Sequence, residues 1–180
     1  PGCAQAYVEL GESLEQRGLH QQALQVLERG RQRVPGYSTL HGMLANTAWR
    51  LGDRERALAA VARATELDPD YRWAWFSRCE WLIELDRHAE ALAIAERLVA
   101  DRPRQALAHE VHAEVLEAVG QHDERVEALR RALALQPRLG SSRLRLCDAL
   151  IDLKRFDDAR SVIAEGQQLH FVSHFEAASR

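Results

Sequence analysis

Apolar residues recur along this chain at helical spacing, and their pattern repeats every 34 residues. Within each unit the apolar positions are three or four residues apart, which is the spacing of one helix face. Three such positions are occupied in phase by Leu14, Leu82, Leu116 and Leu150, by Ala23, Ala57, Ala91 and Ala159, and by Leu27, Val61, Ala95, Leu129 and Ile163. This pattern predicts an all-helical protein without β-strands.

Prolines and glycines mark where the predicted helices end. All five prolines are 34 residues apart, at Pro1, Pro35, Pro69, Pro103 and Pro137. Proline ends a helix because it lacks an N–H group and clashes with the preceding turn. A second break lies midway in each unit, at Gly18, Gly52, Asp86, Gly120 and Lys154. Each unit is therefore predicted to hold two helices of about 14 residues, each about 20 Å long.

This phased set of residues resembles the tetratricopeptide repeat family, whose 34-residue unit is a helix–turn–helix closed by proline. The resemblance rests on Tyr7, Leu10, Gly11, Leu14, Ala23, Leu27 and Pro35, on Leu44, Ala45, Ala57 and Pro69, and on Trp75, Leu82, Ala91 and Pro103. It implies an all-α, right-handed superhelical solenoid of antiparallel helix pairs. The implied repeats cover about residues 4–37, 38–71, 72–105, 106–139 and 140–170, within an array over residues 1–170.

Two departures from the repeat pattern carry their own expectations. Phe171 replaces the closing proline of the last unit, so residues 171–180 are expected to form a cap or the start of a further helix. Arg125 stands where the other units have alanine. We expect its aliphatic stem to lie along the helix pair and its charged head to reach water.

Composition limits the partners and the compartment. The net charge of −3 favours neither nucleic acid nor an anionic membrane as a partner. The three cysteines are too few and too scattered for a disulfide framework, so a reducing, cytoplasmic location is expected. No apolar run is long enough to cross a membrane. The chain begins at Pro1 without Met, so we expect a piece of a longer, bacterial protein.

Neither the histidines nor the cysteines form a complete catalytic or metal-binding set. His109 and His112 are three residues apart, whereas a helical zinc pair needs a spacing of four, and no third ligand is evident. His170 and His174 have the right spacing but also lack further ligands. We therefore expect no enzyme activity, no metal and no cofactor. The remaining candidates share repeat positions and are interpreted as packing residues: His20, His88 and His122, and Cys79 and Cys147.

In the family that this chain resembles, the first helices of the repeats line a concave groove. Matching positions give an acidic, aromatic-containing set. The candidate groove residues are Glu12, Asn46, Trp49, Arg50, Trp73, Phe76, Glu80, Glu110, Glu114, Glu117, Asp148 and Asp152. Like charges four residues apart destabilise a helix, and no arginine lies among Glu110, Glu114 and Glu117 to relieve them. A basic partner is expected for that reason. The alternative is a solvated acidic face without a partner.

The sequence thus predicts a scaffold that binds a basic and apolar segment of a partner protein. Two alternatives remain open. The array is a regulatory or substrate-docking arm of a larger enzyme, such as a bacterial glycosyltransferase or sulfotransferase, or it joins copies of itself through its end repeats. The residues with which some family members grip a C-terminal carboxylate are missing in every register, so such a tail is a poor candidate.

Overall fold

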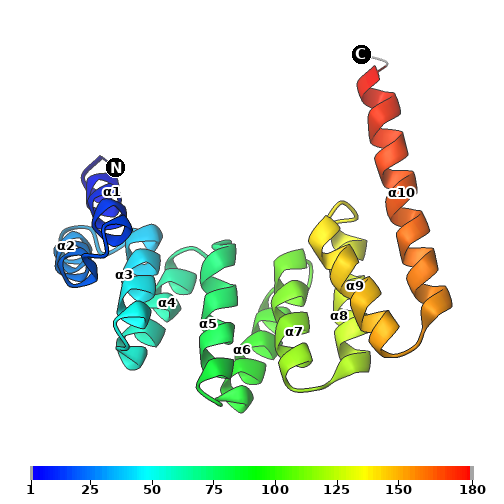
Figure 1. Cartoon of the computed structure of the whole chain (residues 1–180), viewed down its shortest axis with the longest axis horizontal. Coiled ribbons are helices and arrows are strands. Elements are labelled where there is room, and N and C mark those ends of the chain that lie inside the picture. The colour runs from blue at the N-terminus through cyan, green and yellow to red at the C-terminus, as the bar shows by residue number, and fades with distance from the viewer. Residues whose placement is uncertain (1, 179–180) are drawn as a thin grey trace. The chain divides into compact units, whose positions relative to one another are not determined.

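The computed structural model describes the backbone of residues 2–178 and the side chains of residues 3–169. Every regular element in this part of the chain is an α-helix, as predicted (Figure 1). Nine of the helices have 13 to 15 residues, while α10 has 23. The helices are α1 Gly2–Gln16, α2 His20–Arg33, α3 Ser38–Arg50, α4 Arg54–Leu67, α5 Arg72–Glu84, α6 His88–Asp101, α7 Ala106–Ala118, α8 His122–Leu135, α9 Gly140–Asp152 and α10 Phe156–Ala178.

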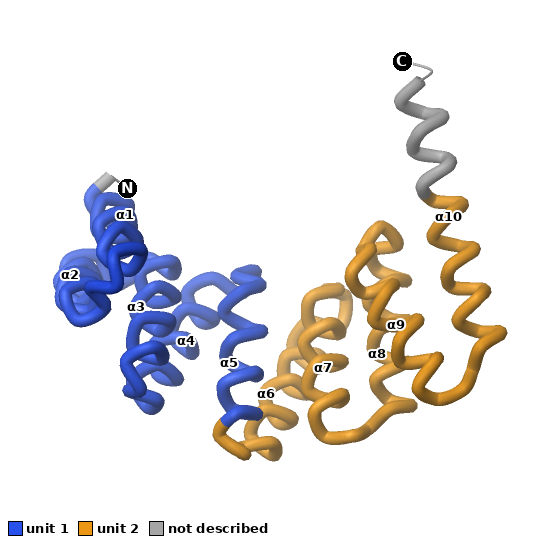
Figure 2. Tube along the Cα trace, in the orientation of Figure 1, with its two compact units in different colours: residues 1–84 blue, residues 85–180 orange. Residues whose placement is uncertain are grey.

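The chain divides into two compact units, residues 1–84 and residues 85–180 (Figure 2). Unit 1 contains α1 to α5 and unit 2 contains α6 to α10. The predicted turns near residues 18, 35, 52, 69, 86, 103, 120, 137 and 154 all fall between helices. The expectation of a cap or further helix at residues 171–180 concerns side chains outside the described residues and stays a prediction.

The turn inside each repeat is a left-handed helix C-cap. Gly18, Gly52 and Gly120 have φ values of 73°, 82° and 75°. Asp86 and Lys154 adopt the same conformation, with φ values of 60° and 58°, although their side chains disfavour it. In four repeats, the residue that follows the left-handed residue donates its backbone N–H to the carbonyl of the residue five positions earlier. This hydrogen bond satisfies a carbonyl at the helix end that has no partner within the helix. These bonds run from Leu19 to Leu14, Asp53 to Ala48, Gln121 to Leu116 and Arg155 to Leu150.

The turn between repeats is held by a bond that recurs with different side chains. Six residues after each of the four prolines that the structure describes, a side-chain nitrogen lies within hydrogen-bond distance of the proline carbonyl. A carbonyl can only accept, so in the two histidines Nε2 carries the proton. The bond satisfies a backbone acceptor that the broken helix leaves without a partner. It joins His41 to Pro35, Trp75 to Pro69 and His109 to Pro103, each at 2.9 Å, and Arg143 to Pro137 at 2.6 Å.

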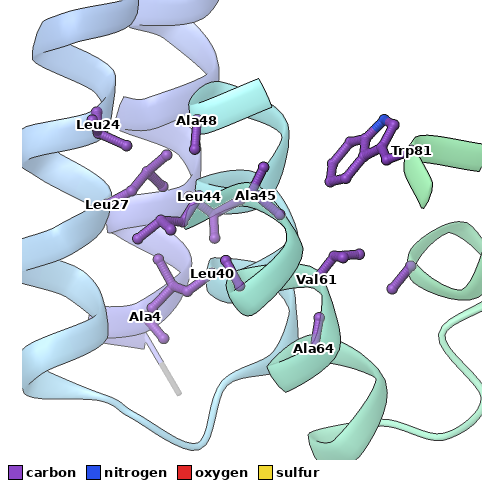
Figure 3. Close-up of a cluster of buried hydrophobic side chains, with 14 residues drawn as sticks. Ala4, Leu24, Leu27, Leu40, Leu44, Ala45, Ala48, Val61, Ala64 and Trp81 are labelled. Atoms are coloured by element: carbon purple, nitrogen blue, oxygen red, sulfur yellow. The ribbon is translucent and has the colours of Figure 1, made fainter. Parts of the chain in front are cut away.

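The core of unit 1 lies where each helix pair meets the next (Figure 3). Ala57 is fully buried, as its phased position predicts. Close approach depends on small residues: a Cβ added at Gly30 of α2 would lie 2.8 Å from Cβ of Tyr7 and 3.0 Å from Cδ2 of Leu40. Any larger residue at Gly30 would push α1 or α3 away.

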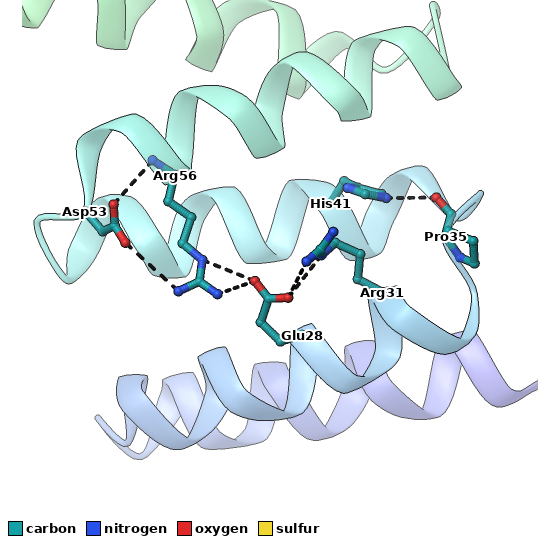
Figure 4. A network of polar contacts seen from close by, with 6 residues as sticks. All are labelled: Glu28, Arg31, Pro35, His41, Asp53 and Arg56. Atoms are coloured by element: carbon teal, nitrogen blue, oxygen red, sulfur yellow. Dashed lines mark hydrogen bonds and ion pairs between the residues drawn. The ribbon is translucent and has the colours of Figure 1, made fainter.

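Charged residues bridge neighbouring second helices in both units. In unit 1, Glu28 of α2 accepts hydrogen bonds from Arg56 of α4 and from Arg31 (Figure 4). Burial raises the pKa of Glu28, but the hydrogen bonds from the two arginines outweigh it and lower the pKa below its usual value. In unit 2, Arg130 of α8 and Asp158 of α10 stand at the same two repeat positions with the charges exchanged, 3.5 Å apart.

Arg125 departs from the expectation drawn from sequence. Its side chain is buried instead of reaching water. The guanidinium group of this α8 residue lies 3.0 Å from Glu117 of α7 and 3.9 Å from Asp152 of α9. Its Nε atom has no hydrogen-bond partner among the described residues. An arginine fits the alanine position here because two carboxylates of the neighbouring first helices receive its head.

Candidate binding surface

Unit 1 contains a cluster of four aromatic rings from α3, α5 and the turn before α5. Trp49 and Trp81 are stacked, with ring centroids 4.6 Å apart and planes 6° apart. Trp73 meets Trp81 edge to face at 6.0 Å, because residues eight apart share one face of α5. Tyr71 lies 5.7 Å from Trp73. We call these residues, Trp49, Tyr71, Trp73 and Trp81, the aromatic cluster.

Of the three predicted aromatic anchors, Trp73 is the one whose side chain is exposed. Trp73 is 38% exposed. The ring of Trp49 carries the guanidinium group of Arg54 at 3.9 Å from its centroid and stacks on Trp81, which is buried. The half-buried ring of Phe76 carries the guanidinium group of Arg72 at 4.7 Å. Because arginine already covers these two rings, Trp73 is the best placed to receive a partner's side chain.

Tyr71 of the aromatic cluster packs against α3 and is influenced by two acidic side chains. A Cβ added at Gly42 would lie 2.7 Å from the hydroxyl of Tyr71, so α3 and this tyrosine are in close contact. Burial, and then the charges of Asp68 and Glu12, raise the pKa of Tyr71.

Two more of the predicted groove residues lie on α3. Asn46 is half-buried. Arg50 is exposed, and its Nε lies 3.5 Å from Glu15 of α1, so the positive charge of Arg50 is partly balanced within unit 1.

The acidic stripe of α7 contradicts the expectation that no arginine relieves it. Glu114 and Glu117 both contact Arg145 of α9, the second at 3.4 Å. Glu117 also contacts Arg125. Spacing within one helix could not reveal these partners, because both arginines lie on other helices. The stripe is therefore neutralised inside unit 2, and a basic partner is not needed to stabilise it.

Glu110 cannot act as an exposed groove residue. Its side chain is only 1% exposed and accepts a hydrogen bond from the hydroxyl of Ser142 in α9. Asp148 and Asp152 of α9, in contrast, are exposed as predicted. The twelve predicted residues divide between the units, seven from Glu12 to Glu80 in unit 1 and five from Glu110 to Asp152 in unit 2. Whether they line one groove stays a prediction.

A model of the tetratricopeptide repeat matches residues 14–74 and residues 48–115, which together span more than half of the chain. The chain belongs to the tetratricopeptide repeat family. Over 81 residues, 45% of its length, this tetratricopeptide array is 37% identical to cellulose synthase 2 operon protein C of Komagataeibacter xylinus. The matched residues span about 6% of the length of that relative.

Solved structures share the fold of this tetratricopeptide array. The structure of MamA from Desulfovibrio magneticus RS-1 superposes with a TM-score of 0.63 at 19% identity, covering 96% of this chain and 97% of that one. The structure of pilF from Pseudomonas aeruginosa superposes with a TM-score of 0.65 at 22% identity, covering 93% of this chain and 76% of that one. At these identities the likeness shows the fold alone.

The histidines and cysteines of the tetratricopeptide array serve packing only in part. Cys3 and His122 are exposed, so the expectation that His122 is a packing residue is wrong, while His20 and His88 are only half-buried. No group of three or more His, Cys, Asp or Glu side chains within residues 3–169 could hold a metal ion. His109 bonds to the carbonyl of Pro103, and burial lowers the pKa of His112. Cys79 and Cys147 are buried, which confirms their interpretation as packing residues. His170 and His174 lie outside the described side chains. No helix in the described part of the chain is long and apolar enough to cross a membrane.

A cavity of about 700 Å³ lies among α8, α9 and α10, and none of the residues that line it is a predicted groove residue. Its walls include Leu133, Leu146 and Val162. Arg143 at its edge is engaged by the carbonyl oxygens of Pro137 and Val162. The residues that line this cavity thus mainly tie α8, α9 and α10 together.

Proposed function

We propose that unit 1 binds a segment of a partner protein and places a large apolar side chain of that segment on Trp73. The tetratricopeptide repeat fold is that of a protein-interaction scaffold, typically without catalysis of its own. What supports the specific surface is the exposure of Trp73 beside the buried ring of Trp81, which is stacked on the half-buried ring of Trp49. A large ring held rigidly from behind loses little conformational entropy on binding, and binding energy at interfaces concentrates on such residues.

Basic residues of the partner segment would lie beside the apolar anchor. Glu12 is exposed on α1 and Glu80 on α5, so both carboxylates lie at the surface of unit 1. The charge of Arg50 is partly balanced by Glu15. Exposed charge pairs contribute only about 0.2–1 kcal/mol each. The acidic residues therefore set the orientation and association rate more than the affinity. In unit 2, Glu114 and Glu117 contribute less than predicted from sequence, because Arg145 and Arg125 already hold them.

A library of fluorescein-labelled peptides tests this proposal. Each peptide carries one central Leu, Phe or Trp, flanked by Arg, by Glu or by Gln, and binding is followed by fluorescence anisotropy. The peptides with Arg beside the apolar residue should bind best. Trp73→Ala should weaken their binding at least tenfold, equal to about 1.4 kcal/mol. Raising the salt toward 1 M should also weaken it, because the screening length falls to about 3 Å.

Two control variants sharpen the result. Leu135→Ala removes a comparably exposed apolar side chain from unit 2 and should leave peptide binding unchanged. Glu114→Gln should have a smaller effect than Trp73→Ala, because Glu114 is already paired with Arg145. Preference for an acidic peptide, or binding that ignores both salt and Trp73→Ala, would show that the partner binds elsewhere.

A second candidate is an arm that docks a partner or substrate inside a longer protein. The likeness to cellulose synthase 2 operon protein C supports it, because the matched stretch is a small part of that relative. The complete reading frame that encodes these residues is the test. A catalytic domain in the same frame would support the arm, and a complete frame without one would contradict it.

A further inference from the structure

A continuous stack of side chains in unit 1 leads from the first residue of α4 to the exposed ring of Trp73. The guanidinium group of Arg54 lies 3.9 Å from the ring centroid of Trp49. Trp81 is stacked on Trp49 at 4.6 Å and occupies one face of that ring, so the guanidinium group must cover the other face. Trp81 in turn meets Trp73 edge to face at 6.0 Å. Arg54 is therefore connected to Trp73 through two intervening rings.

Arg54 is fixed at its end of this stack by a hydrogen bond. Its Nη1 donates to the backbone carbonyl of Trp49 at 2.6 Å, so one side chain holds both the ring and the backbone of the same residue. A planar guanidinium group suits both contacts, because it stacks flat on a ring while its N–H groups reach an acceptor at the edge. The ring of Trp49 is only half-buried, so without Arg54 the covered face would meet water.

The middle of the stack depends on Trp49 for its orientation. Trp81 is buried in the core cluster of unit 1, and its neighbours there from α3 include the small residues Ala45 and Ala48 (Figure 3). Alanine side chains offer little surface to fix the angle of an indole ring. The flat face of Trp49 is the large surface against which Trp81 lies, and the ring of Trp81 is in turn the surface against which Trp73 is placed.

The repeat itself brings these two positions together. Glu15 and His20 stand one repeat before Trp49 and Arg54, and Oε1 of Glu15 lies 3.1 Å from Nδ1 of His20. The end of a first helix and the start of its second helix are therefore in contact in both repeats. Only the second of the five repeats has an aromatic ring and an arginine at this pair of positions.

Given the proposed binding of a partner segment at Trp73, we propose that Arg54 is a positioning residue for that binding. It holds the ring of Trp49 against Trp81 and thereby orients Trp73, without touching the partner segment. The sign of the effect separates this role from that of a charge. The proposed segment is basic, so the loss of a positive charge from unit 1 would by itself favour association. A loss of affinity on removing Arg54 would therefore come from the loosened stack.

Binding kinetics test this role. The probe is a fluorescein-labelled peptide with a central Leu flanked by Arg, followed by anisotropy in a stopped-flow instrument. Arg54→Ala should weaken its binding about two- to fivefold, which corresponds to the loss of one cation–π contact. The whole loss should lie in a faster dissociation rate, because the association rate does not depend on how firmly Trp73 is held. Unchanged or tighter binding to Arg54→Ala would overturn the proposal.

Near-ultraviolet circular dichroism tests the same stack without a peptide. The difference between the spectra of wild type and Trp73→Ala gives the contribution of Trp73, which depends on a fixed arrangement beside Trp81. The same difference taken between Arg54→Ala and the double variant should be smaller, because Trp73 is then held less firmly. An equal difference in both backgrounds would contradict the role of Arg54 alone. Failure of every peptide in the library to bind wild type would instead contradict the proposed function of Trp73.

A matched control separates the stack from a general loss of charge. Arg63 is an exposed arginine of the same helix, and its guanidinium group pairs with Glu66 at 2.8 Å. Arg63→Ala should leave both the dissociation rate and the near-ultraviolet spectrum unchanged. Arg54→Lys replaces Arg54→Ala if far-ultraviolet circular dichroism shows that the latter is unfolded, since it keeps the charge and loses the planar group. An effect of Arg63→Ala equal to that of Arg54→Ala would also overturn the proposal.

Discussion

Units 1 and 2 use the same repeat position in opposite ways. Trp49 in unit 1 and Glu117 in unit 2 are two repeats apart and stand at the same place on their first helices. Trp49 stacks on Trp81 of the next first helix, whereas Glu117 receives Arg145 of the next first helix and Arg125 of its own pair. The repeat determines where neighbouring helices meet, and the side chains at that point decide which force joins them.

Aromatic stacking in unit 1 and ion pairing in unit 2 leave different surfaces for a partner. Stacked aromatic rings contribute about 0.5–1.5 kcal/mol beyond the area they bury, and in unit 1 they leave Trp73 open. In unit 2, Glu114 and Glu117 form ion pairs with arginines, which balance much of their charge within the unit. All four tryptophans of the chain, Trp49, Trp73, Trp75 and Trp81, are in unit 1. Tryptophan fluorescence therefore follows unit 1 alone.

The largest expected effect comes from placing the arginine of unit 2 at the same position in unit 1. Ala57 and Arg125 are equivalent, but Trp49 stands in unit 1 where Glu117 receives the arginine head in unit 2. Ala57→Arg should therefore overpack α3 against α4 and bury a poorly paired charge, lowering the free energy of unfolding by about 3 kcal/mol. Urea unfolding followed by tryptophan fluorescence measures it.

The reverse substitution sharpens this comparison. Arg125→Ala restores the alanine of the other repeats, and the freed Glu117 and Asp152 can reach water. It should lower the free energy of unfolding of unit 2, followed by circular dichroism, by only about 1 kcal/mol. An Ala57→Arg protein as stable as wild type would show that the two positions tolerate arginine for a reason other than the paired carboxylates.

Much of the fold could be predicted from sequence because its determinants are local. The prolines, the left-handed turns and the phased alanines each act within a few residues, and those that the structure describes are placed as the repeat pattern predicts. Arg145 could not be assigned to Glu114 and Glu117 in this way, since their contact depends on how two first helices lie side by side. The recurring hydrogen bond to the proline carbonyl could not be predicted from the sequence either. Its donors His41, Trp75 and Arg143 each offer an N–H group but are different residue types.

An intermediate effect is expected on acidification, and it should appear in both units. Burial lowers the pKa of His41 in unit 1 and of His112 in unit 2 from the ordinary value of 6.5. A base whose pKa is lower in the folded state favours folding when neutral. Its contribution is complete above the unfolded value of 6.5 and is lost as the pH falls through the lower folded value.

Urea unfolding between pH 8 and pH 5 measures this loss, with tryptophan fluorescence for unit 1. His41→Gln keeps a side-chain N–H donor and does not titrate. It should flatten the pH dependence of unit 1 and leave that of unit 2, followed by circular dichroism, unchanged. An equal pH dependence of unit 1 in wild type and His41→Gln would exclude His41 as the source.

The smallest expected effect concerns the turns, where the two units also differ. Both turns within the repeats of unit 1 have glycine at the left-handed position, Gly18 and Gly52, whereas unit 2 has Asp86, Gly120 and Lys154. A lysine in this conformation is strained by its Cβ, while glycine is not, although glycine gains more entropy on unfolding. Lys154→Gly should therefore stabilise unit 2 by about 0.5–1 kcal/mol.

Asp86→Gly should stabilise unit 2 by less than Lys154→Gly does, because aspartate tolerates the left-handed region better than lysine does. Differential unfolding in urea, compared with Gly52→Ala as the opposite change in unit 1, measures both. A gain from Asp86→Gly larger than that from Lys154→Gly would mean that contacts of the replaced side chains, and not backbone strain, control these turns.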